Sequence, residues 1–284
     1  MERYLIINAD DYGVCLSSNQ AVEHLFNEGF ITSTTLMTPC PWAEEALHRA
    51  KNNKKMRVGL HLTLNAEWNL YKWGPVCRTQ LVNSLLDEDG YFYNDVPELL
   101  KAAQANDVTA EIEAQLDFMV KRGYRPTHVD NHMGSVYGLQ GQSFLPEVFA
   151  LCAKHGFNFR LPRSTEFLGQ VPEELSNVFA QVAKTAEGLG IGILDNLCSH
   201  PYALTANDSY ETVRDYYLYL IRSIHPGITE MFLHPAKETE ELKAVCRDWQ
   251  KRVWEYRLML DDIVIKTIEA EGIKLVGWTD APFK

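Results

Sequence analysis

The chain has 284 residues, of which 46% are hydrophobic and 23% are charged, an ordinary composition for a soluble globular protein. Its formal net charge is −11, with a pI near 5.3. This acidic balance argues against non-specific binding to nucleic acids and against binding to anionic membrane surfaces, because both need a basic footprint.

The N-terminal segment and the cysteines predict a cytoplasmic protein. The apolar run before Asp10 and Asp11 has only four residues, which is too short for a signal peptide. No stretch approaches the ~18 apolar residues that a membrane-spanning helix needs. The cysteines lie in apolar runs with irregular gaps, so we expect buried, reduced thiols. They are Cys15, Cys40, Cys77, Cys152, Cys198 and Cys246.

Short apolar, β-branched runs alternate with longer helical patterns along the chain. In order, we expect strand 4–8, helix 18–27, strand 31–37, helix 41–51, strand 57–64, helix 107–121, strand 127–131, helix 146–155, strand 158–161, helix 172–189, strand 192–196, helix 208–225, strand 228–233, helix 238–271 and strand 274–277. This alternation predicts an α/β fold with parallel strands. An irregular (β/α) barrel fits better than a nucleotide-binding fold, because no glycine-rich phosphate loop follows the first strand.

The segment 67–97 interrupts this alternation. It is rich in aromatic residues, Gly and Asn, and its periodicity is weak. We interpret it as a loop-rich insertion over one face, where loops often carry function. Because there are no repeats, linkers or low-complexity tracts, we expect one domain over 1–284.

Polar side chains follow nearly every expected strand at its carboxyl end, which is the active-site edge of a parallel barrel. They are Asn8, Asp10, Asp11, Thr34, Thr35, His61, His128, Asp130, Asn131, His132, Arg160, Arg163, Asp195, Asn196, Glu230 and His234. Packing alone would not place polar groups at so many strand ends. The sequence therefore predicts a functional site at this edge.

Asp10 and Asp11 give the strongest indication of what this site binds. Two adjacent carboxylates that leave a buried strand repel each other unless a cation lies beside them. A divalent metal ion can provide the positive charge, and so can an Arg side chain. The alternative is that one of the two caps a helix that begins near Ser17.

Three histidines extend this pair into a candidate metal site. His61 lies in VGLHLTL, and His128 and His132 form an HxxxH pair in a segment that we interpret as a strand and a turn. Because that segment is not helical, only one of the pair need reach the metal. Imidazoles near a carboxylate suit zinc or another divalent transition ion. The alternative for His61 alone is an ordinary half-buried histidine.

His234 and two Arg residues have both structural and functional interpretations. His234 either closes a strand at the surface or acts as a general acid, because His transfers protons near neutral pH. Arg160 and Arg163 either form structural salt bridges, or one of them steadies the carboxylate of Asp10.

Together these motifs resemble the YdjC family of carbohydrate deacetylases, whose bacterial members include the chitooligosaccharide (diacetylchitobiose) deacetylases. The similarity is strong at LIINADDYG, where the family has a near-identical NADDFG. It continues through GFITSTTLM, VGLHLTL, RPTHVDNH, FRLPR and TEMFLHPA, in the family order and over nearly the whole chain. The sequence differs from the family at Gly134 and Val136, where further histidines are usual.

The resemblance implies an irregular (β/α) barrel related to the polysaccharide deacetylases, with one divalent metal ion held by an aspartate and two histidines. On this sequence the implied ligands are Asp11, His61 and His132, and the implied catalytic base is Asp10. The family is commonly assigned magnesium, whereas the ligand types also suit zinc, cobalt or manganese.

The expected activity is removal of an acetyl group from an N-acetylated sugar or short oligosaccharide, with release of acetate and an amino sugar. The metal would polarise the acetyl carbonyl and lower the pKa of water. Asp10 would take the proton of the attacking water, and Arg160 would hold Asp10 in its ionised form. His234 would protonate the leaving amine, and Asp130 could orient a metal ligand.

Two other functions stay open at this point. Another barrel metal hydrolase, such as a phosphoesterase or an amidohydrolase, would usually bring more ligands, often for two metals. A sugar-binding protein without activity could keep the barrel, but the intact set of Asp10, Asp11, His61 and His132 speaks against it. A homodimer is compatible with the sequence, in which no interface can be read.

Overall fold

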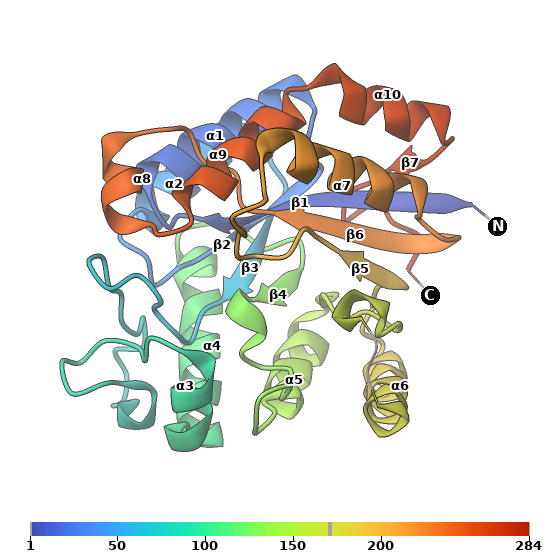
Figure 1. The fold of residues 1–284 in the computed structure, drawn as a ribbon. Coiled ribbons are helices and arrows are strands. Elements are labelled where there is room, and N and C mark those ends of the chain that lie inside the picture. Colours follow the sequence, from blue (N-terminus) through green and yellow to red (C-terminus); the bar gives the residue numbers. More distant parts are fainter. Residues whose placement is uncertain (1, 170–171, 284) are drawn as a thin grey trace.

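The computed structural model describes residues 2–169 and 172–283, and Figure 1 shows a parallel β-sheet with helices packed on two sides of it. Within the described residues the sheet has seven strands in the order β4-β3-β2-β1-β6-β5, and β7 pairs with β1. The strands are β1 (Arg3–Tyr12), β2 (Ser33–Leu36), β3 (Val58–Leu62), β4 (Val129–Asn131), β5 (Asn196–Cys198), β6 (Gly227–Leu233) and β7 (Lys274–Leu275). Because these strands pair in parallel, their carboxyl ends lie at one edge.

β1 forms the centre of the sheet because its side chains are apolar on both faces. Leu5, Ile6 and Ile7 are fully buried, as expected for a strand that is covered on both sides. β6 runs along one edge of β1, while β7 and β2 share the other edge. The polar carboxyl end of β1 therefore lies between β2 and β6.

Two irregular segments continue the curled sheet between β4 and β5. The sequence predicts strands over 158–161 and 192–196, but in the structure Phe159 forms one isolated bridge to Val129 of β4, and Leu194 forms one to Pro162. Of the second predicted strand, only Asn196 belongs to a regular strand, as the first residue of β5. Pro162 takes part in the second bridge, and without an amide hydrogen it cannot continue a regular ladder. The expected irregular barrel of parallel strands and helices is confirmed.

Helices cover both sides of the sheet. They are α1 (Leu16–Glu28), α2 (Ala43–Asn52), α3 (Val96–Ala102), α4 (Ala105–Lys121), α5 (Leu145–His155), α6 (Glu173–Gly188), α7 (Tyr210–Arg222), α8 (Glu240–Val245), α9 (Trp249–Met259) and α10 (Asp262–Ala270). Short 3-10 turns occur at η1 (Asn83–Leu85), η2 (His132–Gly134) and η3 (Glu166–Leu168). In Figure 1, α1, α7, α9 and α10 lie on one side of the sheet, and α3 to α6 lie on the other.

The last helical region differs from its prediction. The sequence predicts one helix over 238–271, whereas the structure has α8, α9 and α10 there. The backbone is extended at Cys246, after α8. The side chain of Asp261 accepts a hydrogen bond from the Ile263 amide and so caps α10. Apolar residues recur on both sides of each break, so the pattern alone does not reveal where the helices end.

The segment 67–97 lies beside the carboxyl edge of the barrel as a loop that contains η1, and α3, which the sequence analysis did not predict, begins at its end. Glu111 of α4 anchors the loop, because its carboxylate accepts hydrogen bonds from the amides of Val76 and Cys77, each 2.9 Å long. The loop is thus tied to the barrel wall by backbone hydrogen bonds to one buried carboxylate.

The cysteines are free thiols, five of them buried and Cys198 half-buried. Burial raises the pKa of Cys152 to about 12, so the unreactive thiol form dominates near neutral pH. No helix in the described part of the chain is both long enough and apolar enough to cross a membrane.

Candidate active site

A β-bulge near the end of β1 sets the directions of Asp10 and Asp11. Between two consecutive backbone pairs, β1 uses one residue more than β2, and Asp11 takes the left-handed conformation with a φ of 61°. Neighbouring side chains of a regular strand point to opposite faces. The extra residue re-aims the strand end, so both carboxylates act on the imidazole of His61.

Asp10 is held by Arg160, one of the two Arg residues that the sequence offered for this role. Arg160 donates through both terminal nitrogens to both carboxylate oxygens, each at 2.6 Å, and Asn8 adds a hydrogen bond of 2.7 Å. Burial alone would raise the pKa of Asp10, but the guanidinium lowers it, so Asp10 is ionised at neutral pH. Arg163 instead pairs with two partly exposed carboxylates.

Arg160 also binds two further buried carboxylates. Its Nη2 lies 2.8 Å from Asp130 Oδ2, and its Nε forms an ion pair with Glu230. The other oxygen of Glu230 accepts a hydrogen bond of 2.7 Å from Trp278 Nε1. Burial raises the pKa of Glu230 to about 8, so Glu230 is largely protonated at neutral pH. The single positive charge of Arg160 is therefore shared mainly by Asp10 and Asp130.

Asp11 lies between a second Arg and two imidazoles. Arg252 Nη2 donates to Asp11 Oδ2 at 2.7 Å. The other oxygen, Oδ1, is buried and accepts no hydrogen bond, although His61 Nε2 and His132 Nδ1 each lie 3.3 Å from it. Burial alone would raise the pKa of Asp11, but Arg252 and the two imidazoles hold it well below its usual range.

Each imidazole is held by a carboxylate at the nitrogen that does not face Asp11. Asp130 Oδ1 lies 2.7 Å from His61 Nδ1, and Glu67 Oε2 lies 2.8 Å from His132 Nε2. Burial alone would lower the pKa of both imidazoles. The surrounding carboxylates raise it instead, to about 10 for His61 and about 9 for His132. The site therefore favours positive charge between these carboxylates.

Two groups of described residues have donor atoms within 4.8 Å of one another, close enough to share a metal ion. One group is Asp11, His61 and His132, and the other is Asp10, His61 and Asp130. Arg160 contacts both carboxylates of the second group. In the first group Arg252 binds only one oxygen of Asp11, and the other oxygen, which faces both imidazoles, accepts no hydrogen bond. The first group is therefore the better candidate.

His128 lies apart from this cluster, although it forms the HxxxH pair with His132. Its ring stacks on Trp278, with centroids 4.5 Å apart and planes 7° apart. It also packs so closely on Gly59 that a Cβ there would come within 2.5 Å of the ring. Burial lowers the pKa of His128 to about 3, so it is a neutral core residue.

His234 follows β6 and is 9% exposed. Its amide donates to Glu255 Oε2 at 2.7 Å, and its ring meets the Tyr202 ring edge-on, with centroids 5.2 Å apart. Burial lowers the pKa of His234 to about 4, although the charges of Asp11 and Asp10 act in the opposite direction. The imidazole is therefore neutral at rest, and its Nδ1 is buried without a hydrogen-bond partner.

Sequence reasoning missed three charged residues that complete the site, namely Glu67, Arg252 and Glu255. The last two belong to α9, where charged residues usually form a solvated face, but the structure buries both of them together with Lys251. The sequence does carry one indication of this burial. In WQKRVWEYRLM, charged residues are mixed with aromatic residues and do not form a separate polar face. Glu67 lies in a segment that has no periodicity to interpret.

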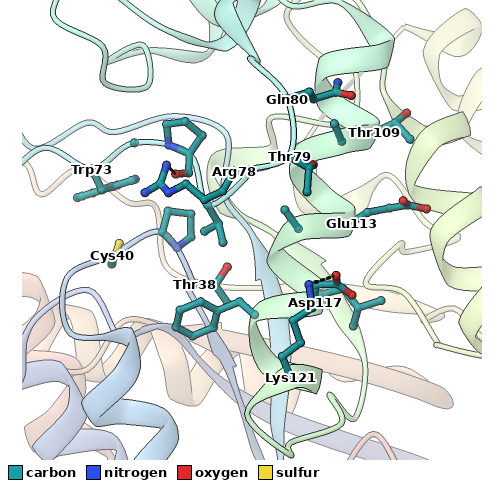
Figure 2. Close-up of a pocket in the computed structure, with 18 of the residues that line it drawn as sticks. Thr38, Cys40, Trp73, Arg78, Thr79, Gln80, Thr109, Glu113, Asp117 and Lys121 are labelled. Atoms are coloured by element: carbon teal, nitrogen blue, oxygen red, sulfur yellow. Dashed lines mark hydrogen bonds and ion pairs between the residues drawn. The ribbon is translucent and has the colours of Figure 1, made fainter.

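A large groove lies beside the candidate site without containing it. Its volume is about 1320 Å³, and Figure 2 shows it bordered by α4, by the loop with Thr38 and Cys40, and by the segment around Arg78. None of the six predicted site residues, all in the described part of the chain, lines this groove. Trp73 separates the two regions, because it lines the groove and its ring lies edge-on to His132, with centroids 6.3 Å apart.

Known proteins are similar to this chain over most or nearly all of its length. A carbohydrate deacetylase of Thermoanaerobacter pseudethanolicus is 27% identical over 277 residues, which cover 98% of each chain. A chitooligosaccharide deacetylase of Yersinia enterocolitica is 29% identical over 228 residues, 71% of this chain and 82% of the relative. A crystal structure from Enterococcus faecalis, named as a proposed cellobiose-phosphate cleavage protein, superposes with a TM-score of 0.79 at 25% identity and covers 98% of each chain.

The family comparison agrees with the fold and with the motif order. The profile described as YdjC-like protein matches residues 4–270. This match covers β1 from its second residue, all of β2 to β6, and every charged residue of the candidate site. It ends before β7. The chain belongs to the YdjC-like protein family.

Proposed function

We propose that this protein is a metal-dependent hydrolase that removes the acetyl group from an N-acetylated sugar or short oligosaccharide. The observation that carries the proposal is the cluster of Asp11, His61 and His132 next to a base candidate, Asp10, that a buried Arg keeps ionised. The relatives named carbohydrate deacetylase and chitooligosaccharide deacetylase support the choice of substrate class.

The donor set fits one divalent metal ion. Asp11 Oδ1 is buried without a hydrogen bond, and an imidazole nitrogen lies 3.3 Å from it on each of two sides. One carboxylate and two imidazoles are a usual set for zinc, and they also suit cobalt or manganese. Magnesium is the ion implied by the family resemblance. When bound, a divalent ion would polarise the acetyl carbonyl and lower the pKa of water.

Asp10 is the proposed general base, which takes a proton from the attacking water. Arg160 fixes both of its oxygens and keeps the carboxylate charged. Oδ1 also accepts the hydrogen bond from Asn8, so Oδ2 is the oxygen with a lone pair for the incoming proton. Because a preorganised base needs no rearrangement during the reaction, this pairing supports rapid proton transfer.

His234 is the proposed group that delivers a proton to the leaving amine. Because His234 is neutral at rest, it must first gain a proton during the reaction. The source is the proton that Asp10 takes from the attacking water. The backbone bond to Glu255 fixes the position of His234. A cytoplasmic location and a homodimer stay predictions from the sequence.

The proposed activity is tested by measuring acetate release from N-acetylglucosamine and N,N′-diacetylchitobiose. We expect release that a chelator suppresses and that one of magnesium, zinc, cobalt or manganese restores. Release of phosphate from an aryl phosphate, without acetate release, would instead indicate a barrel phosphoesterase. Stoichiometric metal with neither activity would contradict the proposed hydrolase.

Replacing His234 by Gln should lower kcat for deacetylation by about 10²-fold, because Gln can donate a hydrogen bond but cannot transfer a proton. KM should change little, since the shape of the site is retained. His225→Gln is the matched control, because His225 is exposed. Equal kcat values for the two variants would rule out a proton-transfer role for His234.

A further inference from the structure

We propose that Glu67 is a positioning residue for the metal ligand His132, and that it thereby links the insertion 67–97 to metal binding. This inference rests on the proposed metal site. Glu67 is the first residue of a segment to which the sequence analysis gave no role in metal binding.

The two proposed imidazole ligands are held in the same manner. His61 faces Asp11 with one nitrogen and binds Asp130 with the other, at 2.7 Å. His132 faces Asp11 with one nitrogen and binds Glu67 with the other, at 2.8 Å. A carboxylate on the second nitrogen of a metal-bound imidazole fixes its tautomer and orientation. Glu67 thus has for His132 the role that Asp130 has for His61.

His132 needs this support more than His61 does. His61 belongs to β3, whose backbone is fixed by strands on both sides. His132 begins the short turn η2, and the next residue, Met133, has the left-handed φ of 51° and is 48% exposed. Besides Asp11 and the ring of His61, the side chains of Glu67 and Trp73 contact the ring of His132, and both come from the insertion.

The insertion also reaches the environment of Asp11. The guanidinium of Arg252, which binds Asp11, lies over the ring of Trp68 at 5.3 Å from its centroid. Trp68 in turn packs edge-on against Trp73, with centroids 6.0 Å apart. Residues 67–73 therefore contact the proposed ligand His132 directly, and they also contact Arg252, which binds the proposed ligand Asp11. Because linkage is reciprocal, a metal ion that orders these ligands must also stabilise the insertion.

The test measures binding of Co²⁺ alone, by competition with a chromogenic chelator and by the visible spectrum of the bound ion. Glu67→Ala should weaken Co²⁺ binding by about 10–100-fold and change the spectrum, because His132 loses its partner. Glu67→Gln keeps a hydrogen-bonding group of the same size and should recover most of the affinity. Glu88→Gln, an exposed change in the same insertion, should match the wild type.

Amide hydrogen exchange gives a second measurement that does not depend on activity. Co²⁺ should slow exchange across residues 67–80 in the wild type and in Glu88→Gln, but not in Glu67→Ala. Equal Co²⁺ affinity in the wild type and in Glu67→Ala would overturn the role of Glu67 and leave the metal site intact. A wild type that binds no more Co²⁺ than Asp11→Asn would overturn the metal site itself, and the inference with it.

Discussion

Replacing Asp10 by Asn is expected to lower kcat for deacetylation by about 10³-fold, while the metal content stays at the wild-type level. Asn has the size of Asp and can still accept a hydrogen bond from Arg160, but it cannot take a proton from water. The metal should remain, because the proposed ligands are Asp11, His61 and His132 and the geometry places Asp10 outside that group.

The measurement combines initial rates of acetate release with metal analysis of the same preparation. Asp262→Asn is the matched control, because Asp262 is an exposed residue of α10. Activity of Asp10→Asn within about tenfold of the wild type would show that another group is the base. Loss of the metal together with the activity would instead place Asp10 among the ligands.

Replacing Arg160 by Met is expected to lower the free energy of unfolding by about 3–5 kcal/mol, and deacetylation should be lost with it. Met fills much of the space, but the buried carboxylates of Asp10 and Asp130 lose their common cation, and the carboxyl group of Glu230 loses its Arg contact. Removing one partner of a buried ion pair has this cost because the remaining charge is uncompensated.

Urea unfolding at several pH values checks this expectation. In the wild type, Arg160 depresses the pKa of Asp10, so this carboxylate adds stability above its unfolded pKa and loses it as the pH falls. The deficit of Arg160→Met should therefore be largest near neutral pH and should shrink towards acidic pH. Arg163→Met, whose partners are partly exposed, should cost less than about 1 kcal/mol. Equal stability losses in both variants would contradict the shared-cation interpretation.

The residues at strand ends were predictable because the topology brings them together. Parallel strands place their carboxyl ends at one edge, so Asp10, Asp11, His61 and His132 had to be neighbours once the strands were recognised. Their polarity after apolar runs was the visible signal. The family resemblance then separated His132 from His128, which local pattern alone did not do.

Other features could not be read from the sequence, for physical reasons. The direction of Asp11 depends on a bulge, and a bulge is set by the register between β1 and β2 rather than by a local pattern. Arg252 and Glu255 lie on α9, where the sequence predicts a solvent-exposed charged face. Only the tertiary packing shows that both side chains are buried. The breaks between α8, α9 and α10 could not be predicted either, because apolar residues recur on both sides of each break.

The pairing of Asp10 and Asp11 with distant cations has a consequence for how the chain folds during synthesis. Their partners follow 150 and 241 residues later. At about 5–20 residues per second, the ribosome delivers Arg252 on the order of ten seconds or more after Asp11. Until then, burying either carboxylate carries an uncompensated desolvation penalty. We therefore expect the carboxyl end of β1 to stay hydrated on the nascent chain until both cations have emerged.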